Sequence, residues 1–169
     1  MNLKKLSILT LTILGTSFSA MATNHVGDFV SYNVILPGIE AVNTSSVTAE
    51  SSADYTVETV TQVGSSRNVT KESVNKDEIF SHEFYNMFIE NCETNIKGKL
   101  VNLMVLGREM LTCKLVGTSL LPFASLINQN PLTIDANTVG WFGDIPVNGL
   151  VQFQSDKFRA SLRTYNWAE

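Results

Sequence analysis

Alternating apolar and polar positions run through most of this chain, and they predict strands joined by short turns. The clearest case is the run 100–106, where every second side chain is apolar, the period-2 pattern of a half-buried strand. Gly107 with Arg108 then provides a tight turn, because glycine accepts a positive φ without steric cost, and an alternating run returns at 110–116. The two runs predict a hairpin. Its apolar positions are Val101, Leu103, Val105, Leu111, Cys113 and Leu115.

The same alternation predicts further strands on both sides of this hairpin. In contrast, residues 39–53 are rich in Ser and Thr and poor in apolar side chains, so we expect an exposed and flexible connection there. Residues 120–131 are apolar but interrupted by two prolines, which predicts either a loop or one short helical turn. The other predicted strands cover residues 28–36, 55–63, 67–74, 132–142, a segment that carries Val151 and Phe153, and 158–167.

One segment, residues 75–91, has the spacing of an amphipathic helix. Asn75 and Glu78 have the spacing of an N-terminal capping box. Packing of its aromatic stripe against the sheet is the first interpretation, and contact with a ligand is the alternative. The stripe consists of Phe80, Phe84, Met87 and Phe88.

Eight or so strands, one helix and short turns make a mainly β protein of the α+β type. Such a chain must protect the edges of its sheet or close the sheet on itself. We therefore expect a strongly curved antiparallel sheet, or half-barrel, with one helix against its concave face.

The first 22 residues have the three parts of a secretory signal peptide. Lys4 and Lys5 precede an apolar run at 6–14, and small residues lead to a predicted cut after Ala22. The apolar run is too short for a permanent membrane anchor, which needs about 20 residues. We expect a single β-rich domain at residues 23–169, located in the periplasm of a bacterium or secreted from it.

Charge excludes one class of partner. The whole chain has a net charge of −4, and removal of the two signal lysines leaves ten basic against sixteen acidic residues, or −6 (10 − 16). Proteins that bind nucleic acids need a basic stripe, and the remaining Lys and Arg are scattered. We expect no nucleic-acid partner.

Cys92 and Cys113 are the only cysteines, so only one intramolecular bridge can form. In an oxidising compartment we expect them to be joined, which stabilises the fold by about 3 kcal/mol in the chain-entropy model. In a reducing cytosol they would remain two buried thiols. The predicted export signal favours the disulfide.

Candidate catalytic chemistry is sparse. The two histidines, His25 and His82, have no further His or Cys at metal-ligand spacing, and we expect His82 to face solvent. Asp135 and Asp144 flank Trp141, which is a possible pair of carboxylates for glycoside cleavage, but Asp144 also stands where a turn residue is expected. We therefore expect no enzymatic activity, no metal and no cofactor.

Two motifs resemble a known pattern. Residues 107–114 (GREMLTCK), followed by Trp141 and residues 145–151 (IPVNGLV), resemble exported bacterial proteins of uncharacterised function. Those proteins are similar in outline to periplasmic lipoprotein carriers and show Gly-x-Phe-x-x-Cys and Pro-x-x-Gly-Leu-Val patterns. Met110 stands here where Phe is usual, and Gln152 where Lys is common. The resemblance implies a concave apolar surface that receives an acyl chain or an extended peptide.

Two functions follow as expectations. The first is a carrier that shields a lipid or another apolar ligand between helix and sheet. The second is a structural or interaction protein that binds another chain through a sheet edge, with residues 28–36 or 158–167 as the edge strand. The candidate apolar pocket consists of Phe84, Phe88, Val101, Leu103, Val105, Val151 and Phe153.

Overall fold

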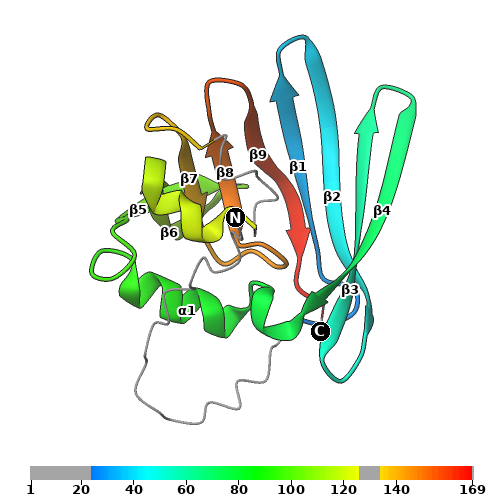
Figure 1. The fold of residues 1–169 in the computed structure, drawn as a ribbon, viewed down its shortest axis with the longest axis horizontal. Coiled ribbons are helices and arrows are strands. Elements are labelled where there is room, and N and C mark those ends of the chain that lie inside the picture. Colours follow the sequence, from blue (N-terminus) through cyan, green and yellow to red (C-terminus); the bar gives the residue numbers. More distant parts are fainter. Residues whose placement is uncertain (1–23, 126–133, 169) are drawn as a thin grey trace, which may run out of the picture.

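The computed structural model describes residues 24–125 and 134–168, so the predicted signal peptide, residues 1–22, lies outside the described residues. The described part is mainly β (Figure 1). Its helices are one α-helix, α1 (His82–Asn91), and two 3₁₀ helices, η1 (Lys76–Glu78) and η2 (Gly117–Phe123). The strands are β1 (Phe29–Leu36), β2 (Ile39–Glu50), β3 (Asp54–Val63), β4 (Ser66–Asn75), β5 (Lys99–Val105), β6 (Arg108–Val116), β7 (Val139–Phe142), β8 (Leu150–Gln154) and β9 (Arg159–Asn166).

All these strands form one antiparallel sheet in the order β4-β3-β2-β1-β9-β8-β7-β6-β5 (Figure 1). The last strand, β9, pairs with the first, β1, so the first and last strands lie side by side in the middle of the sheet. The expected mainly β, antiparallel architecture is confirmed. The sheet is open and not strongly curled, with β4 and β5 as its edges, so the expected half-barrel is not what forms.

The prediction of an exposed connection at residues 39–53 is wrong. Most of that segment is β2, which pairs with β1 on one side and β3 on the other. Its Ser, Thr and Asn side chains bond across the strands: the Ser45 and Thr59 hydroxyls are 2.9 Å apart, and Asn43 Nδ2 donates to Thr61 Oγ1 at 3.1 Å. Polar cross-strand pairs stabilise a strand without an apolar alternation.

The predicted helix at residues 75–91 is divided in two. Asn75 caps only the short η1, and the Ser81 hydroxyl accepts from the Phe84 N–H at 3.2 Å to begin α1. Between them the Phe80 N–H donates to the Val147 carbonyl at 3.1 Å. That bond to a distant loop removes Phe80 from any helical hydrogen-bond ladder and explains the break.

The hairpin and the disulfide are confirmed. β5 and β6 pair in register, and Cys92 at the end of α1 is bonded to Cys113 of β6, with Cα atoms 5.8 Å apart. The turn itself lies one residue earlier than expected, at Leu106 and Gly107, which both have positive φ (49° and 81°) as two-residue hairpin turns require. The bridge fixes the end of α1 to β6, the strand next to the β5 edge of the sheet.

The strand expected at residues 132–142 begins later. Residues 132 and 133 lie outside the described part, and β7 starts only at Val139. Before it, the Asp135 carboxylate accepts from the Asn137 N–H and the Thr138 hydroxyl, both at 2.9 Å, and closes a turn. Of the apolar segment 120–131, the part up to Phe123 belongs to η2, which agrees with the helical-turn alternative there.

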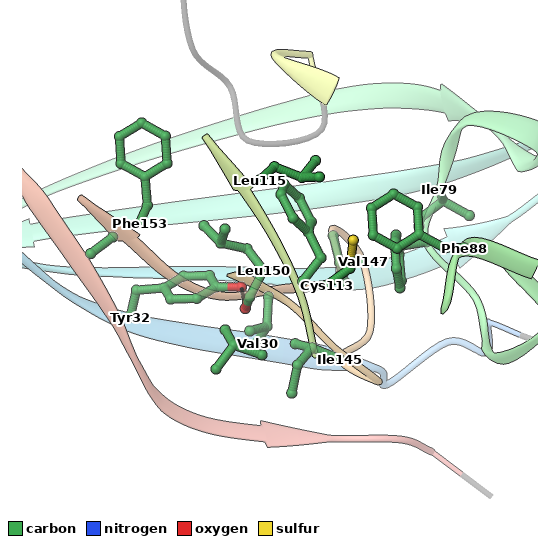
Figure 2. Packing of buried hydrophobic residues seen from close by; sticks show 14 of the residues in the cluster. Val30, Tyr32, Ile79, Phe88, Cys113, Leu115, Ile145, Val147, Leu150 and Phe153 are labelled. Carbon is green, nitrogen blue, oxygen red and sulfur yellow. Dashed lines mark hydrogen bonds between the residues drawn. The ribbon is translucent and has the colours of Figure 1, made fainter. Parts of the chain in front are cut away.

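An aromatic cluster forms the centre of the core between α1, η2 and the sheet. Figure 2 shows this core, with Phe88 of α1 pointing toward side chains of the sheet. Phe88 contacts Phe80, Phe123 and Phe142 with ring centroids 5.8, 5.1 and 5.6 Å apart. Edge-to-face contacts of this kind contribute about 0.5–1.5 kcal/mol each beyond area burial. They hold the helices at a fixed distance from the sheet.

Candidate functional site

A cleft of about 650 Å³ opens on the face of the sheet that α1, η1 and η2 cover. Strands β1 to β4, β8 and β9 supply its floor, and the three helices supply side chains from above. The volume lies within the range of ligand pockets, about 300–1,000 Å³. We refer to this space as the cleft.

One part of the cleft is apolar. Phe153 and Phe158 stack there with ring centroids 4.8 Å apart, which presents a broad aromatic surface to the cavity. Such a lining favours an apolar chain because burial of each CH₂ group contributes about 0.8 kcal/mol. The apolar lining includes Ile79, Phe84, Phe123, Leu150, Phe153 and Phe158.

The floor formed by β2 and β3 is polar, and its polar side chains already have hydrogen-bond partners. Asn43, Ser45 and Thr59 line the cleft there, and all three bond across the two strands. A ligand does not have to replace lost hydrogen bonds on this floor. These polar side chains therefore link β2 to β3, and they also give the cleft a surface that tolerates polar atoms.

Tyr32 connects the cleft wall to the loop before β8. Its buried hydroxyl lies 2.7 Å from Asn148 Oδ1 and 2.6 Å from the Leu150 carbonyl oxygen, and it donates to these acceptors. Burial raises the pKa of the Tyr32 phenol, and the bond to Asn148 opposes that rise only in part. The phenol stays neutral, and it holds the loop against β1.

Three carboxylates stand on the rim of the cleft. Glu72 of β4 and Asp77 and Glu78 of η1 line it and are exposed. No Lys, Arg or His belongs to the lining that the structure describes. The mouth of the cleft therefore carries negative charge.

The structure brings together only part of the predicted pocket. Phe84 and Phe153 both line the cleft. Phe88, 2% exposed, belongs to the aromatic core beneath it, and Val151, 4% exposed, is also buried outside the lining.

The β5 residues of the predicted pocket do not line the cleft. Leu100 pairs with Cys113, and successive side chains of a strand point to opposite faces. The alternating set Val101, Leu103 and Val105 therefore lies on the face opposite Cys113. The register of the hairpin separates two apolar sets that the sequence pattern alone does not distinguish.

Sequence reasoning missed the contribution of β2 and β4. Asn43 and Ser45 lie in the segment predicted to be an exposed connection, and Glu72 lies in a predicted strand where no ligand contact was expected. Alternation of Ser, Thr and Asn with β-branched residues was a usable signal for β2.

A second group of side chains lies at the start of α1. The His82 Nδ1 is 2.7 Å from Asp144 Oδ1, and the His82 ring stacks on Trp167 at 3.9 Å, so His82 does not simply face solvent as expected. Burial raises the pKa of the Asp144 carboxyl, and His82 opposes the rise. Asp135 is engaged in its own turn, where the Thr138 hydroxyl lowers its carboxyl pKa. An imidazole beside a carboxyl can pass a proton, but no serine or thiol nucleophile accompanies it among the described contacts.

The part of the chain at residues 24–125 and 134–168 holds no group of three or more His, Cys, Asp or Glu side chains placed to bind a metal ion. None of its helices has the length and apolarity needed to cross a membrane.

Comparisons of the chain with models of protein families, with curated proteins and with solved structures find no significant match.

Proposed function

We propose that this protein is exported and binds an apolar ligand, such as a lipid or an acyl chain, in the cleft without altering it chemically. The observation that supports this function is the apolar part of the cleft, which Phe84, Phe153 and Phe158 line, within a total cleft volume of about 650 Å³. Ten CH₂ groups buried there would contribute about 8 kcal/mol before the entropy of association is subtracted. That is enough for useful binding.

The arrangement of helix and sheet supports the same proposal. Phe84 of α1 faces a cavity whose floor is the sheet, so the helix lies over the ligand as expected for a carrier. Binding of this kind needs no half-barrel, since an open sheet covered by α1 and η2 leaves a cleft of sufficient size. The resemblance of residues 92–151 to exported bacterial proteins that are similar in outline to lipoprotein carriers stays a prediction.

The location that we propose is the periplasm or the exterior of a bacterium. The Cys92–Cys113 disulfide supports it, because such bridges persist in oxidising compartments. The signal peptide predicted at residues 1–22 supports it independently. N-terminal sequencing of the exported protein should begin at Thr23.

Organic extraction of protein purified from its native periplasm, followed by mass spectrometry, tests the function directly. We expect a lipid or another apolar molecule in stoichiometric amount. The site is tested with the uncharged fluorescent probe N-phenyl-1-naphthylamine. Val34→Trp, which fills the cleft, should weaken binding of this probe by about tenfold, equal to about 1.4 kcal/mol.

Leu111→Trp is the matched control, because Leu111 is 38% exposed and lies outside the lining. It adds the same indole to the surface and should leave binding of the probe unchanged. Equal binding by both variants would show that the apolar ligand, if any, binds elsewhere.

A second function is favoured by a different observation, the free edge at β4. This strand is ten residues long, almost fully exposed and unpaired on its outer side. The strands suggested by the sequence, 28–36 and 158–167, are not edges, because β1 pairs with β2 and β9, and β9 also pairs with β8. Of the two edges, β4 has ten residues against seven in the partly buried β5, so a protein partner would add a strand at β4.

A photocrosslinking residue at Val69, which is 43% exposed on β4, tests this alternative. The same residue at Glu90 on α1 is the control. One defined crosslinked partner from Val69 together with an empty cleft would favour the interaction function over the carrier.

A further inference from the structure

We infer that the ligand of the cleft is a cationic amphiphile, an apolar chain that ends in an amine or a quaternary ammonium group. This inference rests on the proposed function and specifies the class of ligand. It follows from how charge and apolar surface are distributed around one cavity.

The carboxylates come from β4 and η1, and the apolar lining begins beside them. Ile79 directly follows Glu78, Val74 of β4 and Phe84 of α1 line the same space, and the lining continues to Phe153 and Phe158. An apolar chain bound along this lining therefore has its head group beside the carboxylates.

The carboxylates of the rim are not neutralised by the protein. The lysines of the same segment bind other acids: Lys71 pairs with Glu58 at 3.0 Å, and Lys76 pairs with Glu50. The described contacts give Glu72, Asp77 and Glu78 no ion-pair partner. Their field is therefore available to a ligand that enters the cleft.

Anionic, neutral and cationic head groups would interact differently with these three carboxylates. A phosphate or carboxylate head would be placed among like charges with no basic side chain in the described lining to offset them. A neutral head would gain no charge–charge attraction from the carboxylates. A cationic head is attracted by all three carboxylates, and exposed pairs of this kind together give a preference of about tenfold at low salt.

Three surfactants with one decyl chain test the inference: decyltrimethylammonium, decyl maltoside and decyl sulfate. Calorimetry of the mature protein is performed below the micelle concentrations and at low salt. We expect the ammonium surfactant to bind about tenfold more tightly than the maltoside, with the sulfate weaker than both. The preference should shrink in 0.5 M salt because exposed charges are screened.

A triple variant, E72Q/D77N/E78Q, should lose the preference for the ammonium head and keep its affinity for decyl maltoside. The control E40Q/E90Q/E109Q removes the same charge from exposed positions outside the lining and should keep the preference. Loss of the preference in the control as well would mean that net charge, not the rim, is responsible, and would overturn the inference.

The remaining outcomes separate the two proposals. Equal affinity for the three surfactants, or tightest binding of the sulfate, would overturn the cationic ligand and leave the apolar carrier intact. No binding of any surfactant would overturn the carrier function and this inference with it. Binding of a basic apolar peptide in place of all three would indicate a protein partner and would also overturn it.

Discussion

Two aspartates illustrate how opposite environments act on the same side chain. Asp144 is half-buried beside His82, and its carboxyl pKa is raised, mainly by burial. Asp135 is exposed to solvent, and its carboxyl pKa is lowered, mainly by the hydroxyl of Thr138. Ionisation of Asp144 therefore opposes folding, whereas ionisation of Asp135 favours it.

The pH dependence of stability should change in opposite directions when these residues are replaced. A raised folded pKa means that the stability contributed by Asp144 is complete below the unfolded pKa of about 3.8 and declines as the pH rises above it. The advantage of the wild type over Asp144→Asn should therefore shrink between pH 3.8 and neutrality.

For Asp135→Asn the stability advantage of the wild type should change with pH in the opposite direction. A lowered folded pKa contributes stability above about pH 3.8, and this stability is lost as the pH falls. Urea unfolding of both variants over this range measures the two slopes. Slopes of the same sign would contradict the assignment of burial as the main cause at Asp144.

The Tyr32 hydroxyl provides a second prediction for a single residue. Tyr32→Phe removes the donor shared by Asn148 and the Leu150 carbonyl and leaves those acceptors in a buried place. We expect a loss of about 1–2 kcal/mol in the free energy of unfolding, measured in urea. Tyr165→Phe is the control, since its hydroxyl makes no hydrogen bond among the described residues, and it should change stability by less than about 0.5 kcal/mol. Equal losses would mean that ring packing, not the hydroxyl, is affected.

At the scale of elements, α1 is attached to the sheet by the disulfide and by aromatic packing. Cys92 and Cys113 are separated by 21 positions, and closure of such a loop stabilises the fold by about 3 kcal/mol. Reduction should therefore lower the melting temperature by about 6–12 °C for a domain of this size.

Differential scanning calorimetry with and without a phosphine reductant measures this shift. The variant Cys92→Ala/Cys113→Ala should melt at the temperature of the reduced wild type and should not respond to the reductant. An unchanged melting temperature of the wild type on reduction would show that aromatic packing alone positions α1.

Elements with a local signal were predicted well from the sequence, and elements defined by distant partners were not. Apolar alternation located the β5–β6 hairpin and the strands of β1, β3, β4 and β9. It could not identify β2, whose stability comes from polar pairs with its neighbours. It also could not show that Phe80 leaves the helix, because its partner Val147 is 67 positions away.

The residues of the candidate site likewise divide into those that the sequence pattern predicted and those whose position depends on distant partners. Phe84 and Phe153 were selected from their positions on predicted apolar faces, and both line the cleft. Val101, Leu103 and Val105 have an equally regular pattern, but the pairing of Leu100 with Cys113 turns them to the other face. Periodicity shows that a strand has an apolar face, whereas only the register shows what that face meets.

At the scale of the whole molecule, β9 joins two groups of four strands. On one side it pairs with β1 of the group β1–β4, and on the other with β8 of the group β5–β8. Deletion of residues 159–169 should abolish the cooperative thermal transition, because it exposes the paired sides of both β1 and β8. Circular dichroism during heating measures this.

Deletion of residues 167–169 alone is the control, since they follow β9 and its pairing remains complete. That shorter deletion should retain a cooperative transition at a lower temperature, because Trp167 no longer stacks on His82. A cooperative transition with full strand content after the longer deletion would show that the two groups of strands fold independently.

The place of β9 has a consequence for the order in which the molecule is made. A ribosome releases the chain from its N-terminus, so the strand in the middle of the sheet is the last to emerge. Until then β1 and β8 lack a common neighbour, and the sheet cannot be completed. The topology therefore delays completion of the sheet until the last strand has been synthesised.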